Sequence, residues 1–152
     1  MAELYQGTSN SFEYITNCYM DYANEVICRR AFPDLRDGQK IVTRRILYTA
    51  YMNKKGHMEK CIPFVSNAFK LHPDGDQAVY KAFTLLTDEN GSCNIPLFHG
   101  MGNLGKAYSS RKPADMRYPK AIVNDNLEDF FKDKLFQDVE AEDIRDTASL
   151  KK

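Results

Sequence analysis

The sequence has no apolar run approaching the roughly 20 residues that a helix needs to cross a bilayer. It begins with MAELYQGTSNSFEY, which has neither a basic segment nor an apolar one, so we expect no signal peptide. It also has no C-x-x-C pair, since its four cysteines are widely spaced, at Cys18, Cys28, Cys61 and Cys93. This spacing favours reduced, mostly buried thiols over a disulfide or zinc framework. Together these absences predict a cytoplasmic protein with no membrane partner.

Net charge is lacking as well, because 21 basic and 21 acidic side chains cancel. A neutral average argues against a polyanionic partner. The charges are segregated, however. Residues 1–27 carry four acids and no base, residues 28–60 carry nine bases and three acids, and residues 125–152 carry nine acids and five bases. A cationic block of this kind can bind phosphate on one side of the molecule, although a solvated helix face would carry the same charges.

With 152 residues the chain is long enough for one domain with a real core, and its first half reads as helical. Apolar residues recur at helical spacing over 12–27, after Ser11 as a plausible cap. The turn formers FPDLRDG (32–38) end this helix, and a second helix is predicted over 39–52. Its core face consists of Val42, Ile46, Thr49 and Ala50. Lys40 and Arg44 lie on the opposite side, one turn apart, and Arg45 lies on the flank.

A pair of short helices follows, over 61–69 and 79–86, joined by the turn LHPDGD (71–76). The second helix has a polar outer face formed by Gln77, Lys81 and Thr84. The pair suggests a helix-turn-helix, although any αα-hairpin would show the same pattern. Two strands are then expected, NIPLF (94–98) and MRYPKAIV (116–123), with a helix over 127–136 and an acidic tail after them. The predicted fold is mainly α with a small β wing (α+β), a winged helix with two or three short strands.

Three other features of the sequence have simpler explanations than a binding site. GMGNLG (100–105) fits G-x-G-x-x-G, but no helix opens after it and Pro113 interrupts, so we expect a loop with positive-φ or closely approached glycines. His72, Asp74 and Asp76 could be drawn as a metal cluster, but N-capping by one of the aspartates is more economical, and no metal site is expected in this chain. The remaining histidines, His57 and His99, lie in turn-like contexts without an evident partner.

Four segments occur in order: RRAFPDLRDGQKIVTRRILY (29–48), KLHPDGDQAVYKAF (70–83), LFHGMGNLG (97–105) and ADMRY (114–118). Together they resemble motifs of the A subunit of bacterial type IIA topoisomerases, DNA gyrase and topoisomerase IV, over about residues 20 to 123. The resemblance implies that residues 1–124 form a winged-helix DNA-gate domain, which dimerises and binds double-stranded DNA. Residues 125–152 would then form a closing helix and an acidic tail, for which partial disorder is expected.

The resemblance also implies a chemistry. Tyr118 matches the tyrosine that attacks a DNA phosphate, leaves a 5′-phosphotyrosyl link and later reverses the reaction. Arg117 and Arg30 match the arginines that stabilise charge there. The residues expected to bind DNA around that site are Lys40, Arg44, Arg45, His72, Gln77 and Lys81. Mg²⁺ would be held, and ATP used, by a separate B-type subunit. The chain itself would be a bacterial or a virus- or phage-encoded protein that acts in the cytoplasm, associated with the nucleoid. This chain alone should not couple ATP hydrolysis to strand passage.

The departures from the family pattern keep a second interpretation open. Ile41 replaces a proline, Thr43 a histidine and Asp74 the second histidine of H-P-H-G-D. Pro119 follows the tyrosine where threonine is common, removes an amide donor and favours an extended, strand-like Tyr118. The later domains of the family are not in this sequence, which is either a fragment or a minimal form. The alternative is a non-catalytic homologue that binds DNA or modulates a topoisomerase. A third interpretation, an unrelated winged-helix binder, would not explain four ordered motifs.

Overall fold

The structure, a computed structural model, describes residues 11–72 and 75–132. The chain divides into two units, Met1–Phe32 and Pro33–Lys152. In the first unit, helix α1 (Ser11–Val26) continues into a π-helical turn, η1 (Ile27–Ala31). The predicted first helix is therefore confirmed, and its end is the turn at Phe32, whose N–H donates to the Ile27 carbonyl over 3.3 Å.

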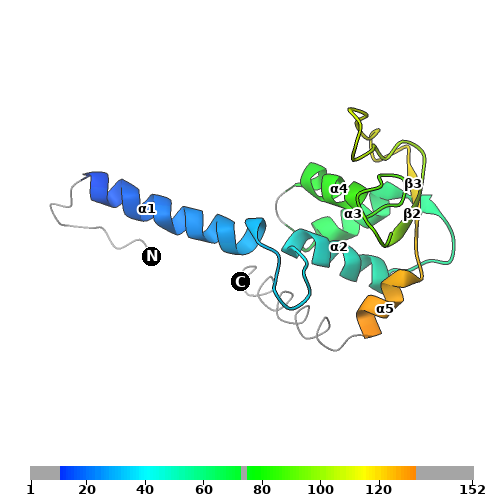
Figure 1. Ribbon diagram of the computed structural model, residues 1–152, viewed down its shortest axis with the longest axis horizontal. Helices are drawn as coiled ribbons and strands as arrows, with labels where there is room; N and C mark the ends of the chain where they lie inside the picture. Colours follow the sequence, from blue (N-terminus) through cyan, green and yellow to red (C-terminus); the bar gives the residue numbers. More distant parts are fainter. Residues whose placement is uncertain (1–10, 73–74, 133–152) are drawn as a thin grey trace. The chain divides into compact units, whose positions relative to one another are not determined.

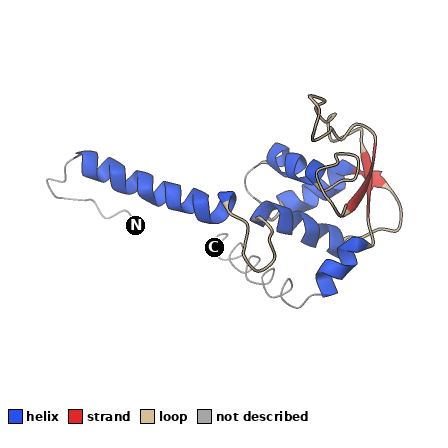
Figure 2. Ribbon diagram, viewed as in Figure 1, coloured by secondary structure: helices blue, strands red, loops and turns tan. Residues whose placement is uncertain are grey.

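The second unit contains four helices and a small sheet among its described residues (Figures 1 and 2). In chain order the elements are α2 (Ile41–Met52), β1 (Glu59–Lys60), α3 (Cys61–Phe69), α4 (Asp76–Leu85), β2 (Phe98–Met101), β3 (Lys120–Val123) and α5 (Asn126–Lys132). Helices α2, α3 and α4 pack on one another beside the sheet. This α+β, winged-helix-like arrangement confirms the predicted fold class.

The core follows from the apolar faces of the three packed helices. Phe64, Phe83 and Phe98 form an aromatic cluster with ring centroids 4.9 to 5.6 Å apart. Helix α5 closes the core with buried Leu127 and with Phe131, whose ring stacks on Tyr51 at 4.1 Å. Burial of this apolar surface is the main stabilising contribution, at about 25 cal/mol per Å² removed from water.

The sheet has the order β1-β3-β2 and is antiparallel throughout, so β3 is its central strand. The prediction of a strand over 94–98 is wrong in position, because β2 begins only at Phe98 and continues into the glycine-rich segment. Gly100 belongs to β2 through its pairing with Ala121 on β3. A Cβ built at Gly100 would clash with Cδ1 of the Leu104 side chain, which would have to shift.

The segment between β2 and β3 is a glycine loop followed by a projecting excursion over 106–112 (Figure 1). Gly102 and Gly105 adopt φ angles of 103° and 77°, which favour glycine, so the interpretation of GMGNLG as a loop is confirmed for these two positions. The base of the excursion is closed by Asn103, whose Nδ2 donates to the Lys112 carbonyl over 3.0 Å. The Asn103 carbonyl accepts from the Ala114 N–H over 2.9 Å.

Several smaller expectations were wrong. Thr84 is buried and donates its hydroxyl to the Lys81 carbonyl over 2.8 Å, so it does not belong to the outer face of α4. The N-cap of α4 is Gly75 at φ 92°, with no side-chain cap, and Asp76 is the first helical residue. Asp74 and the acidic tail over 133–152 lie outside the described residues.

All four cysteines are free, but they are not mostly buried. Cys61 is buried, Cys93 is half-buried, and Cys18 and Cys28 are exposed. In the part of the chain that the structure describes, no helix is both long and apolar enough to cross a membrane.

Candidate functional site

Tyr118 lies at the end of a tight turn rather than in a strand, so the predicted strand over 116–123 forms only from Lys120 onward. The Tyr118 N–H donates to the Asp115 carbonyl over 3.0 Å. The Asp115 carboxylate accepts from the Arg117 N–H over 3.0 Å, which is the geometry of an Asx-turn. The local sequence D-x-R-Y therefore specifies this turn.

The turn presents the phenol of Tyr118 to solvent beside a cation. The Tyr118 residue is 72% exposed. The guanidinium carbon of Arg117 lies 5.8 Å from the centroid of its ring, within cation–π range. Arg117 Nε and Nη2 also donate to the two oxygens of Asp115 over 2.9 and 3.3 Å. These hydrogen bonds lower the pKa of Asp115 and raise the pKa of Arg117, so both groups are charged at neutral pH.

Pro119 holds the backbone next to the exposed Tyr118 in place. Its ring is fully buried, and its carbonyl accepts from the Cys61 N–H over 3.1 Å at the start of α3. A Cβ at Gly102 would lie 3.4 Å from the Pro119 Cα, so the glycine loop packs closely against this proline. Pro119 thus contributes a buried ring and a hydrogen-bond acceptor directly after Tyr118.

Two other candidate residues, Arg45 and His72, lie together. Arg45 Nη1 donates to the Leu71 carbonyl over 2.7 Å and lies 3.2 Å from His72 Nδ1, joining α2 to the end of α3. His72 is buried, with 8% of its surface exposed. Lys40 is exposed at the N-cap of α2, and Gln77 and Lys81 are exposed on α4. The last three residues are therefore placed as the sequence predicts.

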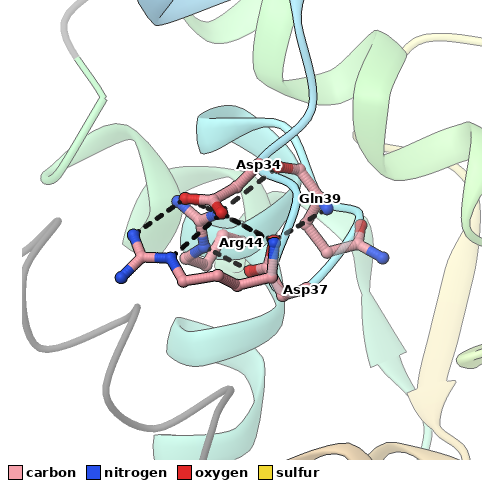
Figure 3. A network of polar contacts seen from close by, with 5 residues as sticks. Asp34, Asp37, Gln39 and Arg44 are labelled. Carbon is pink, nitrogen blue, oxygen red and sulfur yellow. Dashed lines mark hydrogen bonds and ion pairs between the residues drawn. The ribbon is translucent and has the colours of Figure 1, made fainter.

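Arg44 is buried rather than exposed to a DNA backbone, which is a correction to the sequence prediction. Its side chain is only 4% exposed, and that of Asp37 is 1% exposed. Arg44 Nε donates to Asp37 Oδ2 over 2.6 Å and Nη2 donates to Asp37 Oδ1 over 2.9 Å (Figure 3). Nη2 also lies 3.3 Å from the Gln39 carbonyl and 3.7 Å from Asp34 Oδ2. The segment before α2 folds over the helix and buries this arginine.

Arg30 lies in the first unit, on the π-helical turn, and is exposed there. Single π-helical turns within or at the end of α-helices are often found at functional sites. The approach of Arg30 to Tyr118, which lies in the second unit, stays a prediction.

Sequence reasoning missed two arrangements that depend on distant residues. The first is a pair of lysines, Lys60 and Lys120, which the β1–β3 register places directly opposite each other. The second concerns His99, whose predicted lack of a partner was wrong. Its Nδ1 lies 2.6 Å from Asp88 Oδ2, and its Nε2 lies 3.1 Å from Asn124 Nδ2. No linear motif signals either arrangement.

In the described residues, no three His, Cys, Asp or Glu side chains group in a way that could hold a metal ion.

Comparison with known families matches residues 30–143 to the A subunit of DNA gyrase and topoisomerase IV. The chain belongs to that family. The matched region begins at Arg30 and contains all the candidate residues, including the turn that carries Tyr118. The resemblance noted in the sequence is thereby confirmed.

Individual relatives agree with this assignment. The DNA gyrase A subunit of Synechocystis sp. is 37% identical over 134 residues, which cover 86% of this chain and 15% of that protein. The DNA topoisomerase 4 A subunit of the same organism is 41% identical over 110 residues, covering 70% of this chain and 12% of that protein. The DNA gyrase A subunit of Spiroplasma citri is 38% identical over 121 residues, covering 77% of this chain and 52% of that protein. The chain thus spans between about an eighth and about half of the length of these three relatives.

Proposed function

We propose that this chain is the DNA-cleaving and rejoining module of a type II topoisomerase. One observation carries the proposal: in a member of the gyrase/topoisomerase IV A-subunit family, the motif tyrosine Tyr118 is 72% exposed, with the Arg117 guanidinium beside its ring. A tyrosine with a packing role would be buried, and a tyrosine in a binding surface would not need a fixed cation at its side.

The proposed reaction is a transesterification. The Tyr118 oxygen attacks a backbone phosphorus, the bond from phosphorus to the 3′ oxygen breaks, and the departing strand end takes a proton as a 3′-hydroxyl. The phenol loses its proton in the same step, so one phosphodiester replaces another and resealing is the reverse. A phenol with a pKa of about 10 is a poor nucleophile at neutral pH unless positive charge stabilises its anion and the phosphorane-like transition state.

Arg117 is proposed to supply part of that charge. Its hydrogen bonds to Asp115 use Nε and Nη2, which leaves Nη1 available for a phosphate oxygen. Since Asp115 also accepts the Arg117 N–H, the carboxylate orients the guanidinium instead of merely neutralising it. Arg30 is proposed as the second arginine of the site, delivered by the π-helical turn.

DNA is proposed to lie across the basic residues of α2 and α4. Lys40, Gln77 and Lys81 are exposed and would contact the backbone directly, together with the Arg45–His72 pair. Such contacts position the duplex and carry little sequence information. For Arg44 we propose an indirect role, in which its ion pair with Asp37 shapes the segment that leads to Lys40.

The metal site and the ATPase are proposed to belong to a partner. Since the chain is a member of the gyrase/topoisomerase IV A-subunit family, Mg²⁺ is proposed to be held by a B-type subunit that also uses ATP. We further propose a homodimer that acts on double-stranded DNA in the cytoplasm, associated with the nucleoid.

The test is covalent trapping. The chain is mixed with supercoiled plasmid, Mg²⁺ and a B-type subunit, then quenched with detergent, and protein attached to cut DNA is measured. Wild type is expected to give a 5′-linked adduct and Tyr118→Phe, which removes one oxygen and little volume, to give none. If wild type binds the plasmid but yields no adduct with any B-type subunit offered, the non-catalytic alternative replaces this proposal.

A further inference from the structure

The β1–β3 ladder places two lysines directly across from each other. Lys60 pairs with Lys120, and Glu59 with Ala121. Residues directly opposite in an antiparallel pair project to the same face, with Cβ atoms about 5 Å apart. Like charges at this distance destabilise a sheet. The repulsion between Lys60 and Lys120 therefore destabilises the folded chain unless another interaction offsets it.

No counter-ion in the described part of the chain relieves this repulsion. The nearest carboxylate along β1, Glu59, lies on the opposite face of the strand and accepts from Lys55 Nζ over 2.7 Å. On its other side Lys120 pairs with Met101, which is apolar. Both lysines are exposed, so their ammonium groups are available to a ligand.

The lysine pair is rigidly connected to Tyr118. Lys120 follows Tyr118 by two residues, and the buried Pro119 lies between them. The Pro119 carbonyl accepts from the N–H of Cys61, the residue directly after Lys60. The two strands that carry the lysines are therefore joined directly beside the backbone of Tyr118.

We propose that Lys60 and Lys120 together bind a phosphate of the DNA backbone next to the one that Tyr118 attacks. The inference rests on the proposed function and extends it by two positioning residues. Two ammonium groups held on one face suit a doubly contacted phosphate, since binding an anion there removes the repulsion that the fold otherwise carries. The role assigned is to hold the strand in register, and the chemical step remains with Tyr118 and Arg117.

The proposal predicts that removing these lysines stabilises the free protein but weakens its binding to DNA. Replacing Lys60 or Lys120 by Gln relieves repulsion, so the free protein should unfold at a temperature higher by about 1–3 °C. The double change also removes one phosphate contact, so the salt slope of DNA binding should fall by about 0.9 in the double variant and by less in each single variant. Between about 50 and 200 mM salt, wild type should therefore lose about 3.5-fold more affinity than the double variant.

Binding is measured with a short duplex in the Tyr118→Phe background, so that no covalent product forms. Lys132→Gln is the matched control, because it removes the same charge from an exposed lysine on α5 that donates to Asp129 over 2.8 Å. This control should leave the salt slope unchanged and should not raise the unfolding temperature. With Tyr118 restored, the lysine variants should reach the wild-type yield of covalent adduct at low salt and fall below it as salt rises.

The result that overturns the inference is an unchanged salt slope in the double variant, or a lowered unfolding temperature, which would mean that the lysines stabilise the sheet. Failure of the proposed function is a different outcome, since wild type would then give no Tyr118-dependent adduct at any salt concentration. A wild type that does not bind the duplex at all would overturn both.

Discussion

Replacing Asp37 by Asn should strongly destabilise the second unit, because the change removes the closer of the two carboxylates that a buried arginine contacts. The Asp37–Arg44 pair is bidentate, at 2.6 and 2.9 Å, and its two side chains are 1% and 4% exposed. Breaking a buried pair from one side typically costs about 3–5 kcal/mol. We expect about 3 kcal/mol, near the lower end of that range, since the amide oxygen of Asn can still accept one hydrogen bond. This corresponds to a fall of roughly 10 °C in Tm.

The double-mutant cycle is completed by Arg44→Met and by the double variant. Arg44→Met should cost a similar amount, because it leaves the Asp37 carboxylate buried without its cation, although the Gln39 N–H still donates to it over 2.9 Å. The double variant should be much less destabilised than the sum of the two single changes, with a coupling of about 1–3 kcal/mol. Because the introduced asparagine would still be polar, the double variant should remain about 3–5 kcal/mol less stable than wild type.

The assay is urea unfolding followed by far-UV circular dichroism, with the free energy of unfolding compared among the four proteins. A cost below about 1 kcal/mol for Asp37→Asn would refute the reasoning, since it would show that water reaches the pair. Under conditions in which it stays folded, the double variant also separates two roles for Arg44. If Arg44 only shapes the segment before α2, the salt slope of DNA binding stays at the wild-type value, and a loss of about 0.9 would instead indicate a phosphate contact.

Two further predictions follow from single ionisable groups. Arg36 lowers the pKa of Asp34 to about 2, so the stability that this carboxylate contributes is complete above its usual pKa of 3.8 and disappears as the pH falls through about 2. The stability difference between wild type and Asp34→Asn, measured by thermal unfolding from pH 6 to 2, should shrink in that window, and a constant difference would contradict it. Burial raises the pKa of the Cys61 thiol to about 12. Iodoacetamide at about pH 8 should therefore modify Cys18 and Cys28 first and Cys61 only in urea, which mass spectrometry can measure. Rapid loss of the Cys61 thiol in the folded protein would instead show that the core opens.

The helices can be predicted from the sequence because their signal is local. The apolar spacing of α2, α3 and α4 indicates which residues meet in the core, and Val79, Phe83 and Ile46 are buried as that spacing requires. Arg44 shows where the same reasoning stops. A helical wheel identifies the side opposite the main core, but it cannot show that the chain before the helix folds back and covers that side.

The strands are harder to predict because short strands depend on their partners. The residues around Tyr118 have strand propensity, yet the Asp115 side chain accepts from the Arg117 N–H and forms a turn before the strand begins. Gly100 reads as loop in the sequence, but it belongs to β2 and pairs with Ala121, and the side chain of Leu104 occupies the space that a Cβ would need there. The pairing of Lys60 with Lys120 depends on a register between distant segments, and no local pattern encodes it.

The position of β3 also has a mechanical consequence. In the proposed reaction a DNA end becomes covalently attached to Tyr118, and any tension on that DNA passes into the backbone at Pro119. The residues that follow, Lys120–Val123, form the central strand, which is hydrogen-bonded to β1 on one side and to β2 on the other. A pull along this strand loads the flanking hydrogen bonds in shear, all at once, and Pro119 is additionally tied to α3 through Cys61. In the proposed reaction, the small sheet would therefore anchor the attached DNA end, so that tension on the DNA does not unfold the protein at the point of attachment.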